Sequence, residues 1–227
     1  MLGGMSWEST LSYYKKINEA VNTELGDLHS AKISLSSVDF DEIQKLQHQG
    51  KWGEISKILT AEAKSLEVSG ADFLIICTNT IHKVADKIES SISIPILHIA
   101  DATASKLIND NINKVGLIGT RFTMEEPFYK NRLSDLFNIE VIVPTKDQQS
   151  CIHDVIYDEL CLGVINPQSR NLYLQIIESL YQQGAEAIIL GCTEIALLIN
   201  QQDTKVPLYD TTEIHSVAAV NLAIASK

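Results

Sequence analysis

Two short polar segments, each following an apolar run, contain the residues best suited to chemistry. Thr78 opens a Thr-Asn-Thr segment after residues 73–77, and Cys192 lies in a Gly-Cys-Thr-Glu segment after residues 187–190. A thiol with a reference pKa of about 8.5 can become a thiolate near neutral pH beside a helix N-terminus or a cation. Cys192 precedes a predicted helix, and the alternative interpretation is an inert packing cysteine.

The two segments belong to a duplicated sequence. Residues 70–81 (GADFLIICTNTI) match residues 184–195 (GAEAIILGCTEI) without gaps, at a constant offset of 184 − 70 = 114. Each copy is followed by a short helical stretch and then by a strand opened with proline, at 94–97 and 206–209. Two buried strands could match by chance, but the shared flanks favour a true duplication. Thr78 and Cys192 then occupy equivalent positions.

The elements that must position these residues alternate between strands and helices. Apolar residues at spacings of three and four predict helices over 54–67 and 172–181. Short β-branched runs between the helical stretches indicate βαβ units. With the duplication, this predicts an α/β fold of two similar three-layer domains, with mostly parallel sheets related by a pseudo-twofold axis. The predicted strands are 31–38, 72–77, 94–99, 114–118, 139–143, 185–190 and 206–209.

Ligands of open parallel sheets gather outside the carboxyl ends of the strands, where Thr78 and Cys192 are expected. If the halves face each other, these residues lie on opposite sides of a small molecule held in the cleft between the domains. Moving a proton off one face of a carbon and onto the other needs an acceptor and a donor in that arrangement. The pattern therefore favours racemisation.

Composition narrows the function further. The 227 residues are 45% hydrophobic, and 18 basic against 29 acidic residues give a net charge of −11 with no basic run. This argues against a nucleic-acid or anionic-membrane partner. The longest apolar runs fall far short of the roughly 20 residues that cross a bilayer, and nothing resembles a signal peptide. The four cysteines show neither a disulfide framework nor metal-binding spacing. We expect a cytoplasmic protein with free thiols and no metal.

The chain resembles the aspartate/glutamate racemase superfamily of cofactor-independent amino-acid racemases. The motifs are LGGMSWES at 2–9, Thr-Asn-Thr at 78–80 with His82, Gly-Thr-Arg at 119–121 with Thr123, and LGCTE at 190–194. The resemblance spans the whole chain. It implies a first domain of 1–98 plus 208–227, to which the last helix returns, and a second domain of 99–207. It also implies a homodimer that acts on a small-molecule amino acid through Thr78 and Cys192, without pyridoxal phosphate or any other cofactor.

One catalytic position departs from the common family pattern. Most members have cysteine at both positions, whereas Thr78 stands where the first would be. A hydroxyl is a far poorer acid and base than a thiol, and the adjacent Cys77 points to the opposite face of its strand, where packing is the expected role. A smaller subgroup that shares Thr-Asn-Thr and the LCLG stretch at 160–163 is regarded as racemase. We expect weak activity, or activity that is unequal between enantiomers.

The resemblance assigns roles to several further residues. Glu194 matches an acidic residue paired with the catalytic cysteine, and because a carboxylate raises a thiol's pKa, proton relay is its expected role. Asp39 and Asp41 are candidates for the same role beside Thr78, and His82 is expected to start a helix. Helix capping is the alternative for the hydroxyl and amide side chains expected to hold the substrate. The expected substrate-binding residues are Met5, Asn79, Thr80, Thr120, Thr123 and Thr193.

The motifs do not define which amino acid is the substrate. Aspartate-selective relatives bind the substrate's side-chain carboxylate with basic residues, but the matching stretches here, 41–47 and 159–162, contain no arginine. Gln47 is the expected polar contact instead. Loss of a desolvated charge pair shifts selectivity by orders of magnitude. A neutral or broad range of amino acids is therefore an alternative to aspartate or glutamate.

Two other functions fit the same residues. One-cysteine relatives include decarboxylases and isomerases of small carboxylates, and a degenerate member could bind an amino acid without turnover. Retention of both Thr-Asn-Thr and Gly-Cys-Thr-Glu favours racemisation over either alternative.

Overall fold

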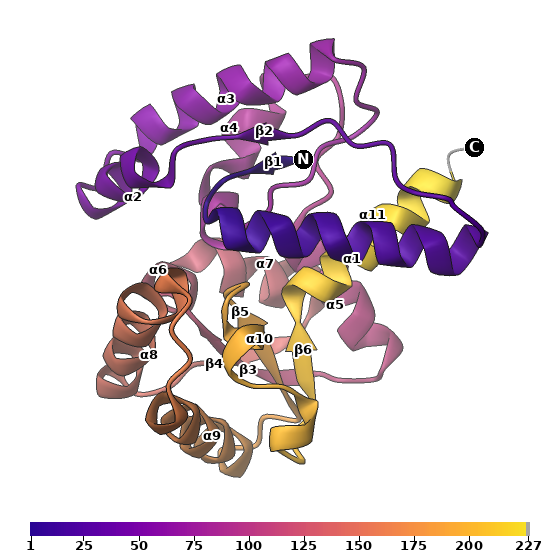
Figure 1. The fold of residues 1–227 in the computed structure, drawn as a ribbon. Helices are drawn as coiled ribbons and strands as arrows, with labels where there is room; N and C mark the ends of the chain where they lie inside the picture. Colours follow the sequence, from indigo (N-terminus) through magenta and orange to yellow (C-terminus); the bar gives the residue numbers. More distant parts are fainter. Residues whose placement is uncertain (226–227) are drawn as a thin grey trace. The chain divides into compact units, whose positions relative to one another are not determined.

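A computed structural model describes residues 1–225, and the chain divides into two compact units (Figure 1). The first contains Met1–Ile99 and the segment from His215 onward, and the second contains Ala100–Ile214. The chain passes from one unit to the other within α5 (Ile99–Asn109) and α11 (Thr211–Ala225). No helix within residues 1–225 is both long and apolar enough to span a membrane.

The first unit is built on four short extended segments that run parallel. β1 (Leu2–Gly3) pairs with β2 (Ser36–Ser37) on one side. On the other side Leu2 bridges Ile76, and Leu74 in turn bridges Ile96. The helices of this unit are α1 (Trp7–Leu25), α2 (Phe40–His48), α3 (Trp52–Val68), the 3-10 helix η1 (Thr80–Val84) and α4 (Ala85–Glu89), with α11 from His215 onward.

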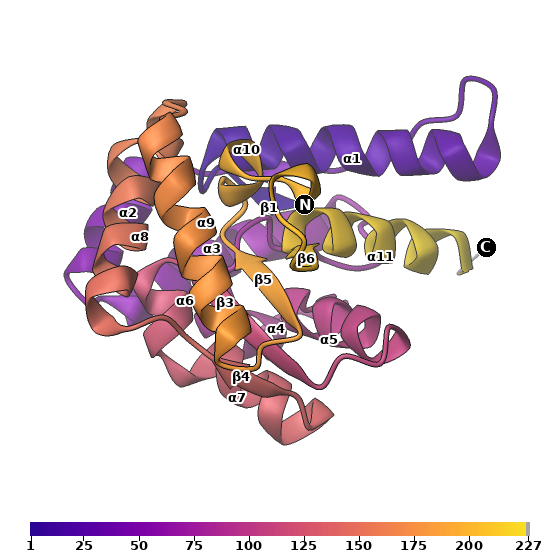
Figure 2. The ribbon, with the colours of Figure 1, turned by 90° about the horizontal axis from the view of Figure 1, so that it is seen from below.

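The apolar run before Thr78 is buried on both faces, as expected for a central parallel strand. Leu74 and Ile76 belong to a core cluster with apolar residues of α3. Ile75 and Cys77 belong to a different cluster, with residues of α1 and α11. This division follows from the alternation of side chains along an extended chain. In Figures 1 and 2, α1 runs alongside the part of α11 that belongs to the first unit.

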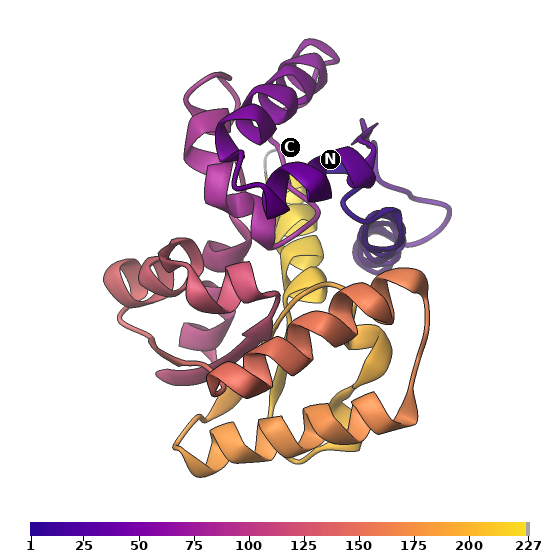
Figure 3. The ribbon, with the colours of Figure 1, turned by 90° about the vertical axis from the view of Figure 1, so that its left-hand side faces the viewer.

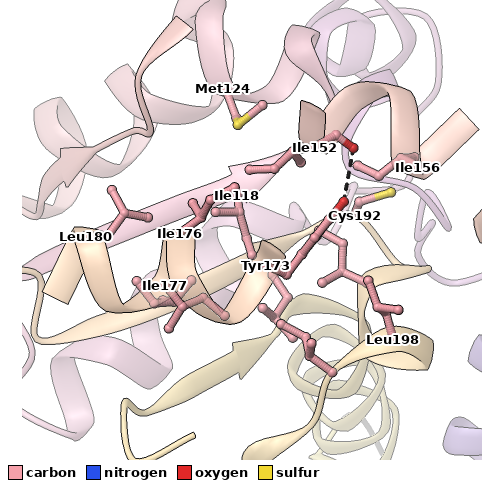
Figure 4. Packing of buried hydrophobic residues seen from close by; sticks show 14 of the residues in the cluster. Ile118, Met124, Ile152, Ile156, Tyr173, Ile176, Ile177, Leu180, Cys192 and Leu198 are labelled. Atoms are coloured by element: carbon pink, nitrogen blue, oxygen red, sulfur yellow. Dashed lines mark hydrogen bonds between the residues drawn. The ribbon is translucent and has the colours of Figure 1, made fainter. Parts of the chain in front are cut away.

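The second unit contains a four-stranded parallel sheet in the order β4 (Glu140–Ile142), β3 (Lys114–Gly119), β5 (Ala187–Gly191) and β6 (Leu208–Asp210). α8 (Lys146–Asp158) and α9 (Pro167–Gln182) lie side by side (Figures 2 and 3). Their apolar faces pack in one cluster with Ile118, Ile188 and Leu190 of the sheet. Figure 4 shows Ile118 among the apolar side chains of the two helices. The remaining elements are α6 (Arg121–Glu125), α7 (Pro127–Phe137), η2 (Leu160–Leu162), α10 (Ile195–Leu198) and η3 (Gln201–Asp203).

The register of the strands reproduces the duplication seen in the sequence. Leu2 faces Ile76 in the first unit, and Ile118 faces Leu190 in the second. Leu74 and Ile188, also 114 residues apart, pair with Ile96 and Leu208. Both units therefore place their extended segments in the same order. The prediction of an α/β fold with mostly parallel sheets is confirmed.

Several boundaries differ from the sequence-based ones. The expected strand over 31–38 is reduced to Ser36–Ser37, while the helices expected over 54–67 and 172–181 lie within the longer α3 and α9. β6 pairs with β5, so residues 208–214 belong to the second unit and not to the first. Gly70 and Gly184 follow α3 and α9 with φ of 87° and 94°, a conformation that glycine adopts readily where helices end.

Candidate active-site residues in the two units

Cys192 lies directly beyond the carboxyl end of β5, where two strands come close together. Gly119 of β3 is the register partner of Gly191, and a Cβ atom added at Gly119 would lie 2.7 Å from the Gly191 carbonyl oxygen. Only glycine fits there without a shift of the backbone. Because the strands are parallel, Thr120 and Cys192 leave the sheet side by side at the edge where ligands are expected.

The Cys192 side chain is hydrogen-bonded to Glu194. Its Sγ donates to Glu194 Oε2 at 3.0 Å, and the Thr193 hydroxyl donates to the same oxygen at 2.7 Å. All three residues are buried. Burial, and after it the Glu194 carboxylate, hold the pKa of Cys192 well above its usual value. The Cys192 thiol is therefore protonated at rest and is not a thiolate, which agrees with the expected effect of the Glu194 carboxylate on its pKa.

Two threonines predicted to bind substrate lie at the start of α6, the helix after β3, with Thr120 as its N-cap. The Thr120 hydroxyl accepts a hydrogen bond from the Thr123 N–H at 3.3 Å, and the two hydroxyl oxygens lie 3.2 Å apart. Both residues are buried. Thr120 therefore caps this helix at the same sheet edge as Cys192, and substrate binding by the two threonines stays a prediction.

Two tyrosines near Cys192 were not predicted. The pKa of Tyr157 and that of Tyr173 are both raised, first by burial and next by interaction with Cys192. The Tyr173 hydroxyl donates to the Ile152 carbonyl at 3.0 Å (Figure 4). These residues come from α8 and α9, and only their packing shows their proximity to the thiol.

In the first unit, Thr78 follows the extended segment that contains Ile76 and is half-buried. Its carbonyl oxygen lies 2.8 Å from Nδ1 of the buried His82. Asn79 precedes the 3-10 helix η1, which begins at Thr80, and both residues are buried. His82 therefore lies inside this helix rather than merely starting it.

The thiol next to Thr78 has a packing role, as expected. Cys77 is buried, and burial raises the pKa of its thiol to about 12. Its carbonyl accepts a hydrogen bond from the Ser9 hydroxyl at 2.7 Å. A thiol with that pKa is protonated throughout the physiological range, so Cys77 does not supply the missing base.

The remaining predicted residues of the first unit differ in their surroundings. Gln47 is buried in α2, and its Oε1 has no hydrogen-bond partner within residues 1–225. Met5 is buried in the core cluster of α3. Asp39 caps α2 by accepting from the Asp41 N–H at 3.1 Å. Asp41 pairs with Lys45 on the exposed surface, so neither carboxylate is engaged with Thr78.

Residues 2–219 match the Asp/Glu/Hydantoin racemase family. The chain belongs to this family. The resemblance found in the motifs is thus confirmed, and membership of the racemase family supports an amino-acid racemase.

Solved structures and a curated sequence extend the comparison. A Yersinia pestis protein assigned as an Asp/Glu racemase is 51% identical, with a TM-score of 0.92, over 98% of this chain and 97% of its own. An aspartate racemase homologue from Pyrococcus horikoshii OT3 is 32% identical, with a TM-score of 0.85, over 100% and 97%. The broad specificity amino-acid racemase RacX of Bacillus subtilis is 24% identical over 76% of this chain and 74% of its own.

Proposed function

We propose that the protein is an amino-acid racemase that interconverts L and D enantiomers by proton transfer at the α-carbon, without pyridoxal phosphate. The observation that carries this proposal is the buried thiol–carboxylate pair of Cys192 and Glu194 at the end of β5. Family membership supports the same reaction class.

On the Cys192 side, Glu194 acts as a proton relay. The carboxylate accepts the thiol proton along the existing hydrogen bond, which leaves a thiolate and a carboxylic acid. The thiolate then removes the α-proton of the substrate, giving a carbanion and a neutral thiol. Reversal of these steps returns a proton to the same face. The raised pKa of Cys192 makes the thiol a stable proton donor at rest, ready to protonate a carbanion.

On the other face, the Thr78 hydroxyl passes on a proton but is a poor initiating base. Asp39 and Asp41 were candidates for resupplying it, but both carboxylates are engaged at the start of α2. We propose that solvent resupplies this proton. Removal of the α-proton from the Thr78 side is then slower than its removal by Cys192.

We propose a neutral or broad range of amino-acid substrates. The Gln47 amide is buried and neutral, so it can hydrogen-bond a polar side chain but cannot form the charge pair that would favour a side-chain carboxylate. The name of the Bacillus subtilis relative, a broad specificity racemase, points the same way.

The test is a panel of single-enantiomer amino acids in heavy water, with no cofactor added. Proton NMR follows loss of the α-proton, and chiral chromatography follows the appearance of the opposite enantiomer. A racemase gives both signals for at least one amino acid. Exchange without inversion for every amino acid would indicate one-sided chemistry, and saturable binding without exchange would indicate a binding protein. Either result would overturn the proposed function.

A further inference from the structure

Three histidines, His82, His98 and His215, form a cluster in the first unit that contacts Thr78 through His82. The ring of His82 lies edge-on to the ring of His98, with centroids 4.5 Å apart, and to that of His215 at 6.0 Å. All three are buried. Within residues 1–225, no group of three or more His, Cys, Asp or Glu side chains is arranged to hold a metal ion. The contacts that define the role of the cluster are its hydrogen bonds.

The contacts of His82 fix its tautomer. The Ile99 N–H can only donate, and it points at His82 Nε2 at 3.3 Å. Nε2 is therefore the acceptor, and Nδ1 carries the proton that is donated to the Thr78 carbonyl oxygen at 2.8 Å. Burial, followed by the neighbouring histidines, lowers the pKa of His82 well below its usual value, which agrees with a neutral ring.

The hydrogen bond from His82 to the Thr78 carbonyl fixes the orientation of the whole peptide group between Thr78 and Asn79. The peptide group between Thr78 and Asn79 is planar, and in a trans peptide the N–H points opposite to the C=O. Holding the Thr78 carbonyl toward His82 therefore directs the Asn79 N–H away from the histidine cluster. It also fixes the backbone from which the Thr78 hydroxyl extends. His82 connects this loop to Ile99, the first residue of α5.

We propose that His82 is a positioning residue for Thr78: its Nδ1–H holds the Thr78–Asn79 peptide so that the hydroxyl reaches its own face of the substrate. This inference rests on the proposed racemase function. His82 itself exchanges no proton with the substrate, and its effect is confined to the half of the reaction that depends on Thr78.

Two variants of His82 separate this role from general packing. In His82→Asn, the amide nitrogen occupies the place of Nδ1 and can still donate to the Thr78 carbonyl. In His82→Gln, the amide reaches the place of Nε2, near the Ile99 N–H, and the donor to Thr78 is lost. Both variants remove the same ring from the same core. His215→Gln is the matched control, because it also removes a ring from the cluster while keeping a donor in place of His215 Nε2, which faces the Leu97 carbonyl at 2.8 Å.

The readout is a ratio of two rates measured in heavy water, using the enantiomer whose α-hydrogen faces Cys192. Conversion to the opposite enantiomer needs Thr78, whereas α-proton exchange with retention does not. His82→Gln should lower the ratio of conversion to exchange by at least about tenfold, since small misplacements of a catalytic group are costly. His82→Asn and His215→Gln should leave the ratio near that of the wild type. Equal ratios in the two His82 variants would overturn the proposal while leaving the racemase function intact.

A second measurement does not depend on turnover. Amide hydrogen exchange of residues 78–82 should be faster in His82→Gln than in His82→Asn, because only the former lacks the donor to Thr78. Equal exchange in the two variants would overturn the positioning role, even if the wild type proved to have no racemase activity. Absence of α-proton exchange in the wild type, with the expected difference in amide exchange, would overturn the proposed function alone.

Discussion

The Cys192 thiol donates its hydrogen bond to Glu194 Oε2 at a distance of 3.0 Å, inside the core of the second unit. A thiol that is buried and faces a carboxylate keeps its proton, and the pKa of Cys192 is raised accordingly. In the proposed mechanism, the pair is an acid that becomes a base only when Glu194 accepts the proton. This arrangement has consequences that can be measured in solution.

Replacing Glu194 by glutamine should lower the pKa of Cys192, because it removes the charge that disfavours the thiolate. Alkylation of Cys192 by iodoacetamide should then begin at a lower pH than in the wild type, while racemisation falls by about 10²-fold because the proton acceptor is lost. Mass spectrometry of the modified peptide follows the alkylation, with Cys192→Ser as the blank. An unchanged alkylation profile would show that Glu194 does not control the thiol.

Substitutions of Thr78 should separate the two halves of the reaction. Thr78→Val keeps the shape but removes the hydroxyl, so conversion between enantiomers should fall by about 10²-fold, with same-face exchange much less affected. Thr78→Cys should speed conversion, because a thiol is a better acid and base. Proton NMR with chiral chromatography measures both rates. Equal loss of both processes in Thr78→Val would mean that Thr78 only positions the substrate.

Gln47 should control selectivity for the substrate side chain. In the wild type, neutral amino acids should exchange their α-proton at least as well as aspartate. Gln47→Arg should raise kcat/KM for aspartate relative to alanine by about tenfold or more, because the new cation pairs with the side-chain carboxylate. Gln47→Met, which has a similar length and no charge, is the control. Strict aspartate preference that survives both substitutions would place the side-chain contact elsewhere.

The stability of the protein should depend on pH through its buried histidines. Burial lowers the pKa of His215 to about 4 in the folded state, against about 6.5 when unfolded. Between these values the unfolded chain binds more protons, so the free energy of unfolding is highest above about pH 6.5 and decreases toward pH 4. For His215 alone the loss amounts to roughly 3 kcal/mol. Urea unfolding at pH 7, 5.5 and 4.5 measures it, and His215→Gln should show a shallower decrease. Equal slopes for the two proteins would contradict this assignment.

The duplication and the apolar runs predict which segments of the chain pair with one another. They predict the boundaries of the strands less well. The pairing positions of Leu74 and Ile188 follow from the 114-residue offset, because the same pattern of buried side chains forms the same register. The strand expected over 31–38 keeps its pairing only in its second half, where the Ser36 N–H donates to the Met1 carbonyl at 3.0 Å and the Val38 N–H to the Gly3 carbonyl at 3.1 Å. At its start, the Ala31 N–H donates instead to Asn18 Oδ1 on α1 at 3.0 Å. Residue type does not reveal such a contact.

The residues of the candidate site can be predicted from sequence where they are close together in one motif. Gly-Cys-Thr-Glu contains both the thiol and its carboxylate partner, so the hydrogen bond between Cys192 and Glu194 follows from residues only two positions apart. The contacts of Tyr157 and His82 join elements that are distant in the chain. The sequence makes Asp39 and Asp41 candidates for a role beside Thr78, but Asp39 caps α2 and Asp41 forms an ion pair with Lys45.

The most direct test of the central claim is α-proton exchange by Cys192→Ser in heavy water, compared with the wild type on the best substrate of the panel. Serine keeps the size and a hydrogen bond to Glu194 but is not a competent base at neutral pH. We predict that exchange and conversion are both lost, while circular dichroism shows the fold intact. Cys77→Ala, which removes the buried thiol beside Thr78, should cost stability but retain exchange. Exchange by Cys192→Ser at the wild-type rate would contradict the account.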